Sequence, residues 1–226
     1  MVTINVSDAL KDVRVCLDEN DVQSTLEALM TENTLMLDDI IKSKIGDAVN
    51  AVSMSAPVEL LGNGKEFADH YYVEGDEVEG AELKALSIVK PADYLRLIRA
   101  KMPDWDYEVS DTISVKSAEY RQQKSRFAGL RGNPQRPVVA DTGTSIELFT
   151  SYYDKVQTLD YVPRVDAVTD TFEISSKALY RAIVYQIAGL TCATLKEADH
   201  AQTLFALAEG VLSVSNETKG NTATAE

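Results

Sequence analysis

The sequence predicts an α+β fold in which N-terminal helices and a C-terminal antiparallel helix pair form a helical bundle, with a small, mostly antiparallel β-domain inserted between them. Three observations support this prediction. Apolar residues recur at three- and four-residue steps near both ends of the 226-residue chain, short alternating runs fill the middle, and prolines lie near several of the transitions. The expected parts are a helical segment 1–56, a β-rich domain 57–163, a helix pair 164–213 and a polar tail 214–226.

The first part is predicted to contain two helices. One is expected to begin with Ser7 as its cap, because Asp8 then lies in the first turn and apolar residues follow at helical spacing. A second is predicted over residues 34–55, where a continuous apolar stripe ends before Pro57. Residues 18–33 are expected to connect the two helices through a short helical turn.

The middle domain is predicted to consist of short strands and turns. A short helix is expected near 91–102, because Pro91 suits a first helical turn and Tyr94, Leu95 and Ile98 could form a buried face. Trp105 is expected in the core or at an interface. Strands are expected at VELL (58–61), GAELKALSIV (80–89), DWDYEVSDTISVKS (104–117, with a turn), PVVA (137–140), SIELF (145–149) and KVQTLDYV (155–162).

The last part is predicted to be two antiparallel helices separated by a break near residues 197–200. Their apolar faces are expected to include Tyr180, Ile183, Ile187 and Leu190 in the first helix and Leu204, Ala208 and Val211 in the second. The tail after these helices is poor in apolar residues, a composition that does not fold by itself.

Charge and composition argue against several functions. The formal net charge is −14, from 36 acidic and 22 basic residues, so the protein is not expected to sequester nucleic acid, although an acidic surface is compatible with DNA passing through a pore. The absence of a long apolar run predicts no membrane span. We expect no cofactor. His70 and His200 have no Cys or Glu at ligand spacing, so the sequence predicts neither a zinc site nor a histidine-based triad, and the acidic run 73–82 is expected to be a solvated loop.

The segment VVADTGTS (138–145) allows two interpretations. An apolar pair followed by Asp-Thr-Gly is how an aspartic protease presents its catalytic Asp, which would be Asp141. That mechanism needs a second carboxylate, here from a second subunit, and the only Gly-containing candidate support, residues 187–189, lies in a helical pattern. The same residues are also typical of a turn between two strands, and we favour the turn.

Just before this segment lies the most unusual charge pattern of the chain, which we call the basic arm (residues 121–136). Between Glu119 and Asp141 there are five bases and no acid. The arm is either a solvated loop with internal ion pairs or a contact for an acidic face of a neighbouring subunit or partner. The candidate interface residues are Arg121, Lys124, Arg126, Arg131 and Arg136.

The order of these parts resembles the neck-ring, or head-to-tail adaptor, proteins of short-tailed phages, and is most similar to those of crAss-like phages. The segments that carry the resemblance are VRVCLDEN, DDIIKSKIGDAVNAV, KPADYLRLIRAKMPDW and YRQQKSRFAGLRGNPQRPVV. The closing stretch ALYRAIVYQIAGLTCATLKEADHAQTLFALAEGVL also resembles the terminal helices of the wider group of tail tubular protein A and adaptor proteins.

The resemblance implies a non-enzymatic virion protein of the neck and tail region, assembled in the host cytoplasm. It implies a homo-oligomeric ring, commonly dodecameric, that contacts the portal and neighbouring ring proteins. Such a ring surrounds the DNA exit channel without sequence-specific binding. The acidic loop 74–82 and the basic arm are candidates for its head-to-tail contact. The alternatives are a dimeric aspartic protease using Asp141 and a soluble, non-enzymatic interaction domain.

Overall fold

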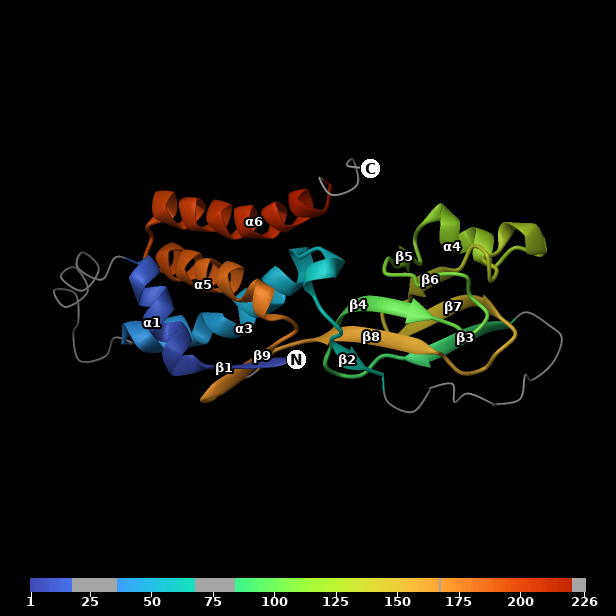
Figure 1. The fold of residues 1–226 in the computed structure, drawn as a ribbon, viewed down its shortest axis with the longest axis horizontal. Helices are drawn as coiled ribbons and strands as arrows, with labels where there is room; N and C mark the ends of the chain where they lie inside the picture. Colours follow the sequence, from blue (N-terminus) through green and yellow to red (C-terminus); the bar gives the residue numbers. More distant parts are fainter. Residues whose placement is uncertain (18–35, 68–83, 167, 221–226) are drawn as a thin grey trace. The chain divides into compact units, whose positions relative to one another are not determined.

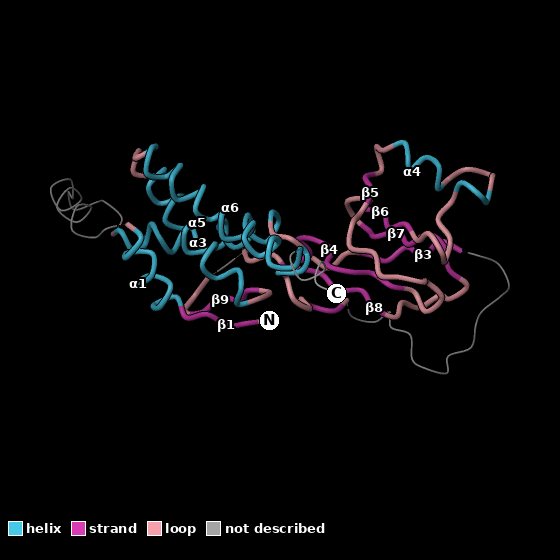
Figure 2. Tube along the Cα trace, turned by 45° about the horizontal axis from the view of Figure 1, so that its top comes forward, coloured by secondary structure: helices cyan, strands magenta, loops and turns pink. Residues whose placement is uncertain are grey.

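The chain has a mixed α+β fold with several antiparallel sheets. The computed structural model describes residues 1–17, 36–67, 84–166 and 168–220. It divides the chain into a helical unit, Met1–Gly62 with Arg164–Glu226, and a β unit, Asn63–Pro163. Figure 2 shows that helices predominate in the first unit and strands in the second.

The helical unit is organised around one central helix. Its elements are β1 Val2–Asn5, α1 Val6–Cys16, α3 Leu37–Ser55, η1 Val58–Leu60, β9 Thr171–Ile174, η3 Lys177–Leu179, α5 Tyr180–Thr194 and α6 Ala198–Gly220. Helix α5 packs against α1, α3 and α6 (Figure 1). Strands β1 and β9 pair in antiparallel fashion. The predicted C-terminal helix pair is confirmed.

The core of the helical unit is mainly aliphatic. Helix α3 buries Ile41, Ile45 and Val49, and α5 buries Ile183 and Ile187. These residues are spaced three or four apart, so each helix places its apolar side chains on one face. Burying each such side chain contributes roughly 1.5–3 kcal/mol relative to leaving it exposed.

Helices α5 and α6 approach closely at a glycine. A Cβ added to Gly189 would lie 2.5 Å from the ring of Phe205, which is closer than side chains tolerate. Because Gly189 has no Cβ, the Phe205 ring of α6 can pack directly against α5. The segment 187–189, considered above as support for a protease site, is helical as predicted.

The N-terminus differs from the prediction. Residues Val2–Asn5 form strand β1 rather than helix, and Asn5, not Ser7, is the N-cap of α1. Strand β1 pairs with β9, which lies about 170 residues away in the chain, so the sequence around β1 gives no indication of the pairing. Helix α3 begins at Leu37 rather than at residue 34. The predicted connection 18–33 lies outside the described residues.

The β unit contains two sheets that share one core. Its elements are β2 Lys65–Glu66, β3 Lys84–Val89, β4 Tyr94–Lys101, β5 Ile113–Ser114, α4 Ala118–Gln123, η2 Ala128–Leu130, β6 Val138–Asp141, β7 Ser145–Ser151 and β8 Thr158–Pro163. One sheet has the order β2-β8-β4 and the other β3-β7-β6-β5. All described pairs are antiparallel except β5 with β6. Leu97, Leu148, Leu159 and Tyr161 meet in the shared core.

Trp105 belongs to this core. Its indole is 3% exposed and donates a hydrogen bond of 3.0 Å to the carbonyl of Thr150. Burial of a large ring with its N–H satisfied is the favourable arrangement for tryptophan. The prediction that Trp105 is a core residue is confirmed.

The helix predicted near 91–102 is wrong: this segment is strand β4. The pairing of β4 with β8 shifts register twice, between Tyr94 and Arg96 and between Leu97 and Arg99. These irregularities place Leu97 and Ile98 in succession in the buried part of the unit and break the alternation expected of a strand. The resulting spacing of apolar residues resembles that of a helix.

Two other strand predictions also need correction. The segment 58–61 contains the 3₁₀ turn η1 instead of a strand. The segment 104–117 contains only the short strand β5 and an isolated bridge at Val109. The other strands are confirmed, with β3, β6, β7 and β8 lying inside or overlapping their predicted segments.

The boundaries of the units also differ slightly from the prediction. The first boundary falls after Gly62 rather than after residue 56, because Leu61 is fully buried and Gly62 lies against Ser175 of the same unit. Helix α6 continues to Gly220, so the first half of the predicted tail 214–226 is helical. Residues 221–226 lie outside the description.

In the described part of the chain, no helix is long and apolar enough to span a membrane.

Candidate functional site: the basic arm

The basic arm begins in a short helix whose end is tied to the start of the following loop. Helix α4 is capped by Ser117, whose hydroxyl accepts a hydrogen bond from the amide of Tyr120. The side chain of Gln123 is buried, and its Oε1 accepts a 2.6 Å bond from the amide of Gly132. The two ends of segment 123–132 therefore lie together, as in a compact surface loop.

Gly132 also ties the arm to the sheet. Its carbonyl accepts a 2.7 Å hydrogen bond from the hydroxyl of Thr150. A Cβ at this position would lie 2.6 Å from the carbonyl oxygen of Phe149, so only glycine fits. The base of the arm is thus held by buried contacts with β7, which gives the residues beyond it a defined position.

The loop is closed a second time nearer its tip. The Nε of Arg131 donates a 2.5 Å hydrogen bond to the carbonyl of Ser125. The hydroxyl of Ser125 accepts from the amide of Phe127, and the amide of Leu130 donates to the carbonyl of Phe127. These bonds give the tip a regular local structure.

The tip exposes two large apolar side chains. Phe127 is 60% exposed and Leu130 is 47% exposed. The guanidinium of Arg126 lies 5.0 Å from the centre of the Phe127 ring, a distance at which a cation interacts favourably with an aromatic face. Aromatic residues and arginine are both enriched at protein interfaces, so an exposed Phe127 beside Arg126 suits a contact surface.

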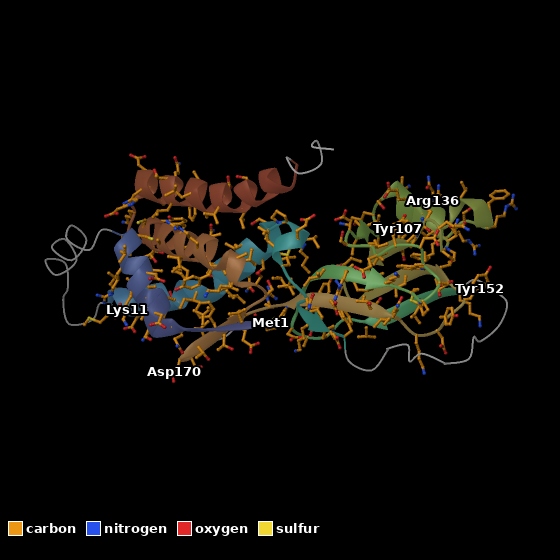
Figure 3. The ribbon with its side chains drawn as sticks, in the orientation of Figure 1. Met1, Lys11, Tyr107, Arg136, Tyr152 and Asp170 are labelled. Atoms are coloured by element: carbon orange, nitrogen blue, oxygen red, sulfur yellow. The ribbon has the colours of Figure 1, made fainter. Side chains whose placement is uncertain are left out.

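The five predicted interface residues fall into two groups. Lys124, although exposed, and Arg131 bond to other groups of the β unit, whereas Arg121, Arg126 and Arg136 are exposed. Within the described residues, no side-chain ion pair joins any of these three arginines to an acid. Arg136, labelled in Figure 3, lies in the loop between η2 and β6. The exposed guanidinium groups are the part of the arm that a partner could bind.

Lys124 is paired with an acidic residue of the same unit. Its Nζ lies 3.0 Å from Oε2 of Glu147, which also accepts a 2.9 Å bond from the hydroxyl of Tyr120. Partial burial alone would lower the pKa of Lys124, but its hydrogen bond to Glu147 and the neighbouring Tyr120 outweigh this effect and raise the pKa. The ammonium also lies 5.2 Å from the ring of Phe149. Lys124 therefore fastens α4 to β7.

The end of the arm is tied back in a different way. Oδ1 of Asn133 accepts hydrogen bonds from the amides of Gln135 and Arg136, forming a tight turn through Pro134. The carbonyl of Pro134 accepts a bond from the amide of Asp106. The chain is thereby guided from the arm into strand β6.

The adjacent segment, VVADTGTS, forms the predicted turn between β6 and β7. Gly143 has φ of 92°, a conformation that glycine adopts readily. Oδ1 of Asp141 accepts a 2.7 Å bond from the Gly143 amide and lies 2.5 Å from the ammonium of Lys90. The hydroxyl of Thr142 bonds to the carbonyl of Ser145. The Asp141 carboxylate is therefore hydrogen-bonded within its own turn and paired with Lys90.

Lys90 extends this network to an aromatic residue. Its ammonium lies 4.4 Å from the centre of the Tyr94 ring. Burial, together with the negative charge of Asp141, raises the pKa of the Tyr94 phenol. The phenol therefore stays protonated, and the network has one positive and one negative charge beside a neutral ring.

Sequence reasoning missed the two exposed apolar residues of the tip. The signal was present in SRFAGLRG, where Phe127 and Leu130 occur in a Gly-containing basic loop rather than in a periodic apolar stripe. It also missed a group formed by Cys192, Glu197 and His200. The acidic loop 74–82 and His70 lie outside the described residues.

Comparison of the chain with protein-family models and with curated proteins gave no match.

Proposed function

We propose that this protein is a non-enzymatic structural subunit of a homo-oligomeric ring in the neck of a short-tailed phage virion. In this proposal its fold is a helical bundle carrying an inserted β-domain, and the basic arm contacts the next subunit or a neighbouring ring. Genomic DNA passes through the ring without sequence-specific binding. The portal and adjacent neck or tail proteins are the expected partners.

The observation that supports the proposal best is the construction of the arm. Its base is held by Gln123 and Gly132, while its tip presents Phe127 and Leu130 next to Arg126. A preorganised loop loses little conformational entropy on binding, and arginine pairs well with carboxylates across an interface. The net charge of −14 means that a second copy offers many carboxylates.

The proposed order of domains has support from the division of the chain. The helical unit contains both ends of the described chain, and the β unit is formed by the single segment Asn63–Pro163. The glycines at the first crossing, Gly62 and Gly64, both have positive φ. This arrangement agrees with a β-domain inserted between N-terminal and C-terminal helices.

The non-enzymatic part of the proposal is supported by the environment of Asp141. An aspartic protease needs this carboxylate to share a proton with a second carboxylate. In the structure its Oδ1 instead contacts the Lys90 ammonium and the Gly143 amide. Both contacts favour the interpretation of DTGT as a turn.

The proposal is tested by the symmetry of the assembly and by charge reversal in the arm. Native mass spectrometry and electron microscopy of the full chain, alone and with a portal protein, are expected to show a closed ring. The double variant Arg121→Glu with Arg126→Glu should weaken ring formation by at least about tenfold, because it places like charges against an acidic partner surface.

A matched control has the same change in charge elsewhere. Lys42→Glu with Lys177→Glu also replaces two exposed bases and should leave ring formation unchanged. Both double variants should keep the wild-type circular dichroism and Trp105 fluorescence, since all four side chains are exposed. Equal assembly of the two double variants would exclude the arm as the contact. A two-fold dimer as the final assembly would contradict the ring itself.

A further inference from the structure

The turn between α5 and α6 brings three side chains of different chemistry together. Helix α5 ends at Thr194, and α6 begins at Ala198. Lys196 adopts a positive φ of 69°, and the amide of Glu197 donates a 2.9 Å bond back to the carbonyl of Cys192. This is the hydrogen bond of a Schellman motif, which reverses the chain within a few residues.

The reversal groups Cys192, Glu197 and His200. Their potential ligand atoms, a sulfur, a carboxylate oxygen and an imidazole nitrogen, all lie within 4.8 Å of one another. Cys192 is buried at the end of α5, while Glu197 and His200 are exposed. Glu197 and His200 also line a hollow on the surface. An ion from solvent could therefore reach the group past its two exposed members.

We propose that Cys192, Glu197 and His200 form a zinc-binding site with a water molecule as the fourth ligand. Thiolate, imidazole and carboxylate are the three side-chain ligands that zinc uses, and three protein ligands plus water is a common tetrahedral set. The thiol and imidazole disfavour calcium and magnesium, which bind through oxygen. Thiolate and carboxylate together neutralise the charge of the ion.

Binding is coupled to loss of a proton. Zinc binds the thiolate rather than the thiol, so Cys192 must lose its proton to become a ligand. Zinc binding breaks the S–H bond, forms a Zn–S bond and releases the proton to solvent. The affinity for zinc should therefore increase with pH.

The site would join the two helices of the C-terminal pair. Cys192 belongs to α5, His200 to the first turn of α6, and Glu197 to the turn between them. A ligand that binds only the folded arrangement stabilises it. Bound zinc is thus expected to raise the melting temperature of the helical unit, which offers a readout independent of ring formation.

The experiment uses cobalt as a spectroscopic probe of the full-length, reduced, metal-free protein. We expect one equivalent of Co²⁺ to produce a thiolate-to-cobalt charge-transfer absorption that Zn²⁺ abolishes by displacement. The absorption should disappear in Cys192→Ser. In His200→Gln the affinity should fall by at least about tenfold, since even changes outside the ligand shell cost that much at metal sites.

The second cysteine provides the control. Cys16→Ser should retain the absorption and the zinc-dependent increase in melting temperature. His200 is exposed, so His200→Gln tests the site even if Cys192→Ser does not fold. The proposal is overturned if the wild type gives no thiolate absorption with cobalt, if His200→Gln binds as tightly as the wild type, or if the absorption is lost in Cys16→Ser.

Discussion

The helical unit and the β unit differ in where their buried polar side chains find hydrogen-bond partners. In the helical unit the hydroxyl of Thr191, which is fully buried, bonds to the carbonyl of Ile187 one turn earlier in the same helix. In the β unit buried polar groups reach distant positions. Thr150 bonds to Gly132, and the buried Asp160 lies 2.6 Å from Arg99.

The difference follows from how each unit satisfies its backbone. A helix pairs its interior amides and carbonyls by itself, so its core can be almost purely aliphatic. The loops of the β unit leave backbone groups such as the Gly132 amide for side chains to satisfy. We therefore expect the helical unit to be most sensitive to lost volume and the arm of the β unit to be most sensitive to lost polar partners.

The largest effect is expected for Ile187→Ala in the helical unit. Ile187 is fully buried on α5, and replacing such a residue by alanine costs about 2–5 kcal/mol in the free energy of unfolding. Urea unfolding followed by far-ultraviolet circular dichroism measures this cost. The exposed Leu207→Ala on α6 is the control and should change stability by less than about 0.5 kcal/mol. A similar cost for both variants would contradict the assigned packing.

A smaller effect is expected for Gln123→Leu in the β unit. This change keeps a side chain of similar size but leaves the buried Gly132 amide without its hydrogen-bond acceptor, which costs about 1–3 kcal/mol. Trp105 is the only tryptophan and lies in the core of this unit, so its fluorescence during urea unfolding reports the loss.

The matched control for Gln123→Leu is Thr191→Val in the helical unit. The Ile187 carbonyl that accepts from Thr191 keeps its helical hydrogen bond, so this variant should cost less than about 1 kcal/mol. If Thr191→Val proved as destabilising as Gln123→Leu, the contrast between the two units would be wrong.

The smallest effect concerns an ion pair of the β unit and depends on pH. Asp93 lies 2.6 Å from the Lys65 ammonium and accepts a 2.8 Å bond from the hydroxyl of Tyr161. Burial alone would raise the pKa of the Asp93 carboxyl, but the bonds from Lys65 and Tyr161 lower it below its ordinary value. A lowered pKa means that ionised Asp93 stabilises the fold above its unfolded pKa, and this contribution is lost as the pH falls through the folded value.

The measurement compares Asp93→Asn with the wild type. Because the pair is partly exposed, we expect the variant to be less stable by under about 1 kcal/mol at about pH 7. The difference should shrink progressively as the pH falls below the unfolded pKa and through the lowered folded pKa, because the carboxylate then becomes protonated in the folded state as well. A difference that stays constant over this range would show that the charge of Asp93 contributes nothing.

Parts of the fold could be predicted because their signals are local. Helices α3, α5 and α6 have apolar residues at helical spacing, and the β6–β7 turn has the expected Asp-Thr-Gly chemistry. Strand β1 could not be predicted, because its pairing with β9 depends on a remote segment. Strand β4 was mistaken for a helix, because two register shifts disturb its alternation.

The candidate site shows the same limit. The concentration of five bases at residues 121–136 is visible in the sequence, but the sequence does not distinguish the exposed arginines from Lys124 and Arg131, which bond inside the unit. Likewise, Cys192, Glu197 and His200 are close in the chain without matching a familiar ligand spacing. Their meeting depends on the positive φ of Lys196, a conformation that lysine rarely adopts.

The α+β class could be predicted from the sequence alone, as could the main helices, the turn at Asp141 and the position of the basic arm. Each depends on the periodicity, turn chemistry or charge of neighbouring residues, which short-range interactions translate into structure. The pairing of β1, the identity of β4 and the bonding of Lys124 and Arg131 inside the β unit became visible only in the three-dimensional structure. These depend on remote partners for hydrogen bonds and packing, and a single sequence does not state which distant residues will meet.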